Sequence, residues 1–401
     1  MHLNKVILNH VNISEECAKI AELDDLIHDK LDNREVDKLI RQIFPLSGFG
    51  SINERLKIIG SKSLIDEFYK IDNKKWDLTE SLSNIKLLGF DGKQLILKFV
   101  NDNNIATGCY DFTYNFLDFL FKMGKYSNFI FENNLEDLAE ENINTLLANF
   151  KDIEMQYRFL EVNNTILLRG ITSTRYNYYD NHLALYLSLL ALNKFSIETG
   201  IVFKVIKAFM TDSAIRIFFE HISPIKIDGV GYVTFGVLVS NNEIRDGVFS
   251  IELRYKLIDI DDKNTSFVAM PPLAHSIITI YHSTSVSNLA NKLDNIYKLK
   301  ERQEEVLSYI YNLKHSVRLS DSVLFNLFKK VIKSRNISKG AKQSFRTLYE
   351  NQTINNTLSL VKVFNLSSTI TTDVDEKTHL ERIYHQVITE IKLKRNKQQD
   401  S

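Results

Sequence analysis

The sequence predicts an α+β fold with a mostly antiparallel central sheet, N-terminal helices and a helical C-terminal third. Three observations support this prediction. Two pairs of apolar strand patterns flank short turns in the first half of the chain, and four more strand patterns follow between residues 201 and 258. After residue 285, apolar residues recur at helical spacing. Strands joined by short turns favour antiparallel pairing.

The N-terminal region, residues 1–150, is expected to combine helices with one β-hairpin. Residues 14–43 have a helical pattern. Two apolar strands over 85–99 flank Asp91-Gly92, a dipeptide typical of tight hairpin turns. A further helix is predicted over 110–121.

The middle region, residues 151–285, holds most of the expected strands. Asn163-Asn164 separates two strand patterns and suits a hairpin turn, because asparagine tolerates positive φ. A helix is predicted over 181–199. Strand patterns then cover 201–209, 214–220, 230–240 and 248–258. The last of these alternates apolar and polar residues, which predicts one face exposed to solvent.

The C-terminal region, residues 286–401, is expected to be helical. Helical patterns cover 286–314, 320–335, 338–350 and 375–393. A turn at Asn336 separates the second helix from the third, so that the pair resembles a helix-turn-helix in outline. Gly340 falls inside the third helix rather than in the turn.

Composition excludes several protein classes. The chain has 401 residues, 44% of them hydrophobic, and a formal net charge of zero, so no global field attracts nucleic acid or a membrane. Cys17 and Cys109 are too few for a disulfide framework or a four-cysteine zinc site. The most apolar helical stretch, 183–192, is too short to cross a bilayer. We expect a cytoplasmic protein with no cofactor, no metal site and no membrane contact.

A polar tract, residues 169–182, connects the second hairpin to the predicted 181–199 helix. It reads Arg-Gly-Ile-Thr-Ser-Thr-Arg-Tyr-Asn-Tyr-Tyr-Asp-Asn-His. Asp180 suits a helix N-cap and Arg175 is placed to pair with it, so a structural role explains much of the tract. A binding role stays open, because guanidinium groups and hydroxyls suit phosphate and tyrosines stack on bases. The candidate binding residues are Arg169, Ser173, Arg175 and Tyr176.

The tract resembles the signature of the phage/plasmid-like proteins of unknown function, an arginine–serine–arginine–tyrosine run followed by Asp-Asn. Asp212–Phe219, Val239–Gly247 and Tyr281-His282 resemble further elements of that family in matching order. The resemblance covers roughly residues 150–290, but Phe267–Met270 stands where the family usually has a Cys-Asn-Gly motif. It implies an intracellular accessory protein encoded by a phage or prophage, and it implies no particular chemistry.

Basic residues concentrate in the C-terminal third. No acid lies between Asp321 and Glu350. The candidate phosphate contacts in this stretch are Lys329, Lys330, Lys333, Arg335, Lys339, Lys342 and Arg346. Arg254, on the polar face of the last strand, is a further candidate that would face a groove. An ordinary solvated basic face is the alternative interpretation.

We therefore expect non-enzymatic binding of DNA or RNA, in the setting of phage DNA replication or recombination. One alternative is an enzyme acting on a phosphate-bearing substrate, with Arg169, Ser173, Arg175 and Asp180 as its site. The other is a structural or protein-interaction protein of a phage, in a particle or against host defence. In that case the acidic segment 131–154 of one copy would meet the basic segment 329–346 of another.

Overall fold

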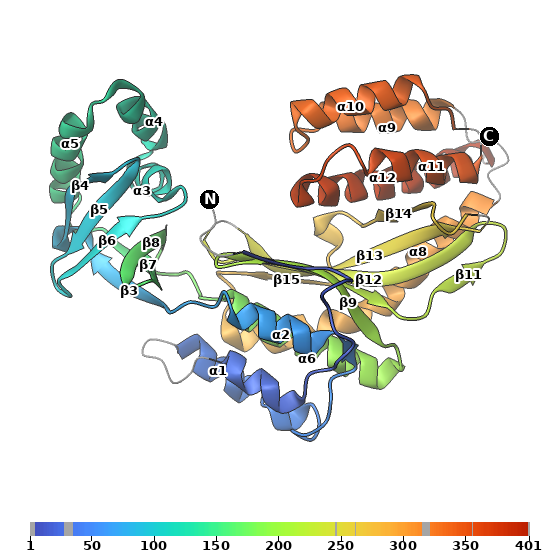
Figure 1. Ribbon diagram of the computed structural model, residues 1–401, viewed down its shortest axis with the longest axis horizontal. Helices are drawn as coiled ribbons and strands as arrows, with labels where there is room; N and C mark the ends of the chain where they lie inside the picture. Colours follow the sequence, from blue (N-terminus) through green and yellow to red (C-terminus); the bar gives the residue numbers. More distant parts are fainter. Residues whose placement is uncertain are drawn as a thin grey trace.

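The computed structural model describes residues 5–27, 35–244, 247–260, 262–314, 321–354 and 356–399. Across these ranges the chain has an α+β fold, as predicted, built around a sheet of six strands and a sheet of nine. Figure 1 shows the two sheets next to each other along the longest axis, with helices packed on each. Antiparallel pairing predominates in both sheets.

The six-stranded sheet has the order β3-β7-β8-β6-β5-β4. Its strands are β3 (Lys75–Ser81), β4 (Ile85–Asp91), β5 (Gln94–Phe99), β6 (Asn104–Gly108), β7 (Glu154–Val162) and β8 (Thr165–Thr172). Its helices are α3 (Phe112–Phe121), α4 (Gly124–Asn133) and α5 (Glu136–Asn149). Both predicted hairpins are present, and Asn163 and Asn164 have φ values of 50° and 63°, as a type I′ turn requires.

This sheet joins segments that the sequence assigns to different regions. β7 and β8 fall in the predicted middle region, yet they pair with β3 and β6. The strands of this sheet come from residues 75–172, so the sheet crosses the predicted boundary at residue 150. The sequence does not predict β3, because three of its buried positions carry the charged residues Lys75, Asp77 and Glu80 instead of apolar residues.

The nine-stranded sheet has the main order β1-β9-β10-β12-β13-β14, with β11, β15 and β2 pairing beside it. Its strands are β1 (Lys5–Leu8), β2 (Ile58–Ile59), β9 (Phe203–Thr211), β10 (Ala214–His221), β11 (Ile225–Ile227), β12 (Gly231–Asn242), β13 (Val248–Asp259), β14 (Ser266–Ala269) and β15 (Ile278–Tyr281). The four strands predicted between 201 and 258 are all present as β9, β10, β12 and β13. Residues 245–246, in the turn between β12 and β13, lie outside the described residues.

Helices α1 (Glu35–Ile43), α2 (Ser61–Tyr69) and α6 (Asn181–Thr199) cover one side of the nine-stranded sheet (Figure 1). α6 is buried around its whole circumference over most of its length, which explains its apolar sequence. No helix in the described ranges is both long enough and apolar enough to cross a membrane. The continuous helix predicted over 14–43 is wrong: Ile20–Leu26 forms a short 3₁₀ helix, and residues 28–34 lie outside the described ranges.

The C-terminal third is helical, as predicted. It contains α7 (Leu289–Leu293), α8 (Lys298–Lys314), α9 (Asp321–Lys333), α10 (Lys339–Glu350), α11 (Thr357–Ser367) and α12 (Val374–Gln399). A 3₁₀ turn, Asp294–Tyr297, joins α7 to α8. Residue 320, the first of the predicted 320–335 helix, is not among the described residues. α9 to α12 form a layer over the nine-stranded sheet on the side away from α6 (Figure 1).

Candidate nucleic-acid interface

Arg169 lies in a network of buried charges where the two sheets meet. The buried charge network consists of Asp72, Lys75, Asp77, Arg158, Arg169, Asp180 and Glu243. Asp180 bridges the two arginines, accepting from Arg158 Nη2 at 2.5 Å and from Arg169 Nη2 at 3.2 Å. Glu243 accepts from Lys75 Nζ at 2.9 Å and also from Arg169 Nη1. These contacts tie the six-stranded sheet to the start of α6 and the end of β12.

The N-terminus of α6 lies against this network. Asp180 occupies the N-cap position, as predicted, but its carboxylate binds the two arginines. Glu243 accepts the Asn181 N–H at 2.8 Å instead. Burial and the neighbouring Asp180 act to raise the pKa of Glu243, yet the surrounding cations outweigh them and lower it. Glu243 is therefore ionised in the interior, and its charge favours the helix N-terminus.

The network corrects the predicted role of Arg169. Its side chain has 0% exposure, and its Nε also donates to the Phe159 carbonyl at 3.3 Å. A phosphate would have to displace a buried carboxylate from it, and breaking a buried ion pair costs roughly 3–5 kcal/mol. We therefore no longer expect Arg169 to bind phosphate. The predicted pairing of Arg175 with Asp180 is wrong. Asp180 pairs with Arg158, and Arg175 is exposed.

Tyr176 covers the network rather than standing free to stack on a base. Its ring lies 4.5 Å from the His282 ring at an angle of 8°, and its Oη donates to the Glu243 carbonyl at 3.1 Å. The Arg158 guanidinium lies 5.4 Å from the centre of the Tyr176 ring. Burial lowers the pKa of His282, so that the stacked imidazole is neutral at pH 7.

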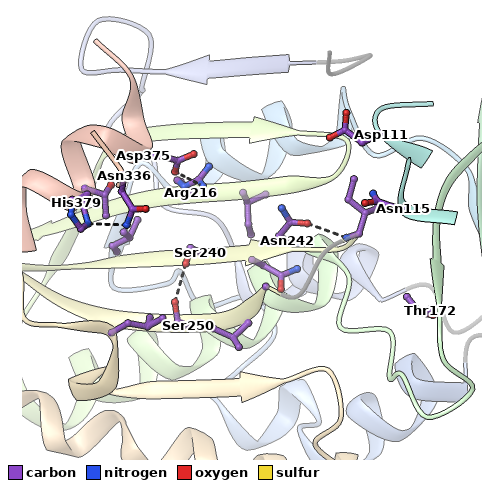
Figure 2. A pocket seen from close by; sticks show the side chains of 18 of the residues that line it. Asp111, Asn115, Thr172, Arg216, Ser240, Asn242, Ser250, Asn336, Asp375 and His379 are labelled. Carbon is purple, nitrogen blue, oxygen red and sulfur yellow. Dashed lines mark hydrogen bonds and ion pairs between the residues drawn. The ribbon is translucent and has the colours of Figure 1, made fainter. Parts of the chain in front are cut away.

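One edge of Tyr176, together with Ser173, lines a cleft of about 1450 Å³. The cleft lies between α3, the nine-stranded sheet and the first turns of α12. Figure 2 shows Asp111 at one end, Asn336 and His379 at the other, and polar strand side chains between them. The tract thus contributes two of its four candidate residues to a surface that a ligand can reach.

The charge of this cleft does not suit phosphate. Its lining acids are Asp111, Asp118, Glu252, Asp373, Asp375 and Glu376, and its lining bases are Lys122, Arg216 and Arg382. Two of the bases are already paired, Arg382 with Glu252 at 2.6 Å and Arg216 with Asp375. The surplus of carboxylates repels anions and favours neutral or cationic groups.

Arg254 does not reach this cleft. Its Nε and Nη2 donate to the two carboxylate oxygens of Glu381 on α12, at 2.9 and 2.7 Å. Its guanidinium lies over the Phe218 ring, 4.7 Å from the ring centre. The alternating pattern of β13 is correct, but α12 covers the face that the sequence predicts to be wet. Arg254 therefore attaches α12 to the sheet, and we no longer expect it to contact nucleic acid.

α9 and α10 form a packed helical hairpin. Phe328 of α9 lies against Phe345 and Tyr349 of α10, with ring centres 6.3 and 4.3 Å apart. Ser338 caps α10 by accepting the Ala341 N–H at 3.3 Å. The turn between the helices is fixed to α12, because the Ser338 N–H donates to Glu376 at 2.8 Å. The hairpin therefore holds its basic side chains on a rigid support.

The basic side chains of this hairpin differ in their availability. Lys330 pairs with Glu390 at 2.7 Å and is half-buried. The other six are exposed or, for Lys342, half-exposed, and no described carboxylate pairs with them. We call these six the α9–α10 surface: Lys329, Lys333, Arg335, Lys339, Lys342 and Arg346. Lys339, Lys342 and Arg346 are spaced i, i+3, i+7 and so lie along one face of α10.

Sequence reasoning misses Arg158 and Glu243, the two residues that link Arg169 and Asp180 to the rest of the buried charge network. Glu243 falls in a polar turn, where a carboxylate is usually solvated. Arg158 could be suspected, because it is a lone cation within the apolar β7 pattern, and a buried cation requires an anionic partner.

The four residues proposed for an enzyme site do not come together. Arg169 and Asp180 are buried and bound to each other, Ser173 lines the cleft, and Arg175 is exposed outside its lining. Across the described residues, no three histidine, cysteine, aspartate or glutamate side chains are placed to hold a metal ion. No family model, curated protein or solved structure matches this chain.

Proposed function

We propose that the protein binds nucleic acid without catalysis, through phosphate contacts made by the α9–α10 surface. The observation that carries this proposal is the gathering of six cations on one helical hairpin, where no described carboxylate pairs with them and no acid occurs from residue 322 to residue 349. Lysine and arginine side chains neutralise phosphates and release the counterions condensed on the nucleic acid. The cleft and the buried charge network are poor alternatives, since the cleft has more acids than bases and the cations of the network already have carboxylate partners.

The arrangement of the hairpin supports contact with a row of phosphates. The face that carries Lys339, Lys342 and Arg346 extends about 10 Å along α10, at 1.5 Å per residue. The N-terminus of α10, with its partial positive charge, begins beside Lys339. Because the turn is fixed to α12, little loop ordering opposes binding.

The polar tract supports a biological setting for this activity. Its resemblance to the phage/plasmid-like proteins favours an intracellular accessory role in the replication or recombination of phage or prophage DNA. Nothing in the surface chemistry favours one base over another, because backbone contacts carry no sequence information. We therefore propose binding with little sequence preference.

The test is binding of fluorescent single-stranded DNA, duplex DNA and RNA, measured by anisotropy over a series of salt concentrations. The test variant changes Lys333, Lys339 and Arg346 to glutamate. For duplex DNA, each phosphate contact contributes roughly 0.9 to the slope of log affinity against log salt. We expect the variant to lose about two to three units of slope and at least tenfold in affinity at low salt.

A matched control separates this surface from net charge. Lys93, Lys125 and Lys151 are exposed lysines on the six-stranded sheet and its helices, and changing them to glutamate alters the net charge by the same amount. The control should bind within about twofold of the unchanged protein. Equal losses in both variants, or no binding by the unchanged protein at low salt, would sink the proposal.

Self-association is a second candidate, favoured by the positions of opposite charges. The exposed acids Glu132, Asp137 and Glu141 lie on or beside α4 and α5. Figure 1 shows these helices on the six-stranded sheet, whereas α9 and α10 lie over the nine-stranded sheet, so the acidic and basic surfaces are separate. Contact between copies would therefore run head to tail and form rings or filaments. Sedimentation at low and high salt tests this candidate, which requires assemblies that dissociate as salt is raised.

A further inference from the structure

A second group of cations lines a small pocket beside β15, away from the α9–α10 surface. The pocket has a volume of about 280 Å³. Its bases are Lys292, Lys298 and Arg302, and its hydrogen-bonding residues are Ser276, Thr279 and Asn295. No carboxylate is among the described residues that line it. Three cations that face one pocket without acids create a strongly anion-attracting site.

The helical segment from α7 to α8 brings these cations together. Lys292, Asn295, Lys298 and Arg302 are spaced so that they follow one side of the nearly continuous helix 289–314. Lys292 Nζ donates to the Thr279 carbonyl at 3.1 Å, which fixes its ammonium group at the wall of the pocket.

Of the three cations, only Arg302 pairs with a described carboxylate. Asp294 pairs with Lys194 at 3.4 Å. Glu305 accepts from Arg302 Nη1 at 2.8 Å, but a guanidinium has five N–H donors and the others stay available. Lys298 is exposed, and no described carboxylate pairs with it. The pocket therefore keeps a surplus of positive charge.

An adjoining pocket of about 610 Å³ has different chemistry. It shares Lys292 and Asn295 with the cationic pocket, and its other described lining residues carry hydroxyl or amide side chains. These are Ser283, Thr284, Ser285, Asn288 and Asn291. Hydroxyls and amides both donate and accept hydrogen bonds, as recognition of a hydroxylated ligand requires.

We propose that the two pockets together bind a small phosphate monoester of a hydroxylated molecule, such as a sugar phosphate. The phosphate lies among the three cations, where ammonium and guanidinium groups form charge-assisted hydrogen bonds with its oxygens. The hydroxylated part lies against the serine, threonine and asparagine side chains of the adjoining pocket. This site is independent of the proposed nucleic-acid binding.

The polar tract supports the wall of the adjoining pocket. Asn177 Nδ2 and Tyr179 Oη both donate to the Thr284 carbonyl, at 2.9 and 2.6 Å. The Asn177 N–H also bonds to the His282 carbonyl, at 2.6 Å. The tract therefore fixes the loop after β15, and Asn177 and Tyr179 act as positioning residues for the proposed site.

The test is isothermal titration calorimetry of the whole protein with ribose 5-phosphate, inorganic phosphate and ribose. We expect ribose 5-phosphate to bind at least about tenfold more tightly than inorganic phosphate, because only the ester uses both pockets. The variant Lys298→Gln/Arg302→Gln should lose about tenfold or more in affinity for ribose 5-phosphate. Lys300→Gln is the matched control, since Lys300 is exposed on the same helix but does not line either pocket.

Each outcome decides the proposal. Loss in the double variant, with Lys300→Gln within about twofold of the unchanged protein, supports it. Absence of binding at millimolar ligand, or equal affinities in all three proteins, overturns it. Equal affinity for inorganic phosphate and ribose 5-phosphate removes the adjoining pocket from the site and contradicts the assigned ligand class. The α9–α10 variant, Lys333→Glu/Lys339→Glu/Arg346→Glu, should keep the ribose 5-phosphate affinity, which separates this site from nucleic-acid binding.

Discussion

The buried charge network and the α9–α10 surface are both built from lysine and arginine, but they hold these residues in opposite conditions. In the network, Lys75, Arg158 and Arg169 are almost fully buried and each contacts at least one carboxylate. On the α9–α10 surface, six cations reach solvent and no described acid opposes them. A cation is available to a partner only where the fold leaves it in excess. The difference indicates a stabilising role for the network and agrees with the binding role proposed for the surface.

The largest expected effect comes from removing one charge of the network. Asp180→Asn removes the negative charge that the buried guanidinium groups of Arg158 and Arg169 share, while it keeps the shape of the side chain. We expect the free energy of unfolding to fall by about 3–5 kcal/mol, as for other broken buried ion pairs. Urea unfolding followed by circular dichroism measures this change.

Asp152→Asn is the matched control, because Asp152 is exposed. Surface substitutions of this kind change stability by less than about 0.5 kcal/mol. A loss below about 1 kcal/mol for Asp180→Asn would contradict the structural role of the network.

The sequence predicts most elements of the fold but not how the two sheets are joined. α6 and the β7–β8 hairpin follow from periodicity and turn chemistry, which are local properties of the chain. The partners of Arg169 are 11 and 74 residues away along the chain, so no local pattern identifies them. For the same reason, the sequence places Arg254 on a solvated strand face, whereas in the structure α12 supplies its partner Glu381 from 127 residues further on.

The basic surface is predicted more completely because exposure requires no partner. The spacing of apolar residues in an amphipathic helix shows which positions are exposed, and the run without acids can be read directly from the sequence. Only Lys330 differs, because its partner Glu390 lies on another helix. The pocket beside β15 was not predicted, since its cations come from one helix but its hydroxyls come from a separate loop.

A change of pH should separate the interior from the surface. Burial lowers the pKa of His221 and of His385 to about 4, from an ordinary value of 6.5. Between pH 6.5 and about pH 4, these histidines bind a proton in the unfolded state but not in the folded state. The free energy of unfolding should therefore decrease as pH falls, by about 2 kcal/mol per histidine between pH 7 and pH 5. No histidine lies between residues 321 and 350, so this prediction concerns the interior and not the α9–α10 surface.

Urea unfolding at pH 7, 6 and 5 measures this dependence. The variant His385→Phe should weaken it, because one of the two buried imidazoles is removed. The exposed His10 gives the comparison, and His10→Phe should leave the dependence unchanged. A free energy of unfolding that is constant from pH 7 to pH 5 would show that these imidazoles are not held neutral.

The smallest expected effect tests how freely the surface accepts change. A Cβ atom added at Gly340, in the first turn of α10, meets no atom within 4 Å. Gly340→Ala should therefore stabilise the protein by about 0.5–1 kcal/mol, because alanine loses less backbone entropy in a helix. It adds no charge, so affinity for nucleic acid should stay within about twofold.

In the interior, Gly236→Ala should instead destabilise the protein, because its Cβ would lie 2.0 Å from the Phe219 carbonyl oxygen. Thermal unfolding of the two variants measures the difference, and a loss of stability in Gly340→Ala would mean that the start of α10 is packed rather than open to a ligand.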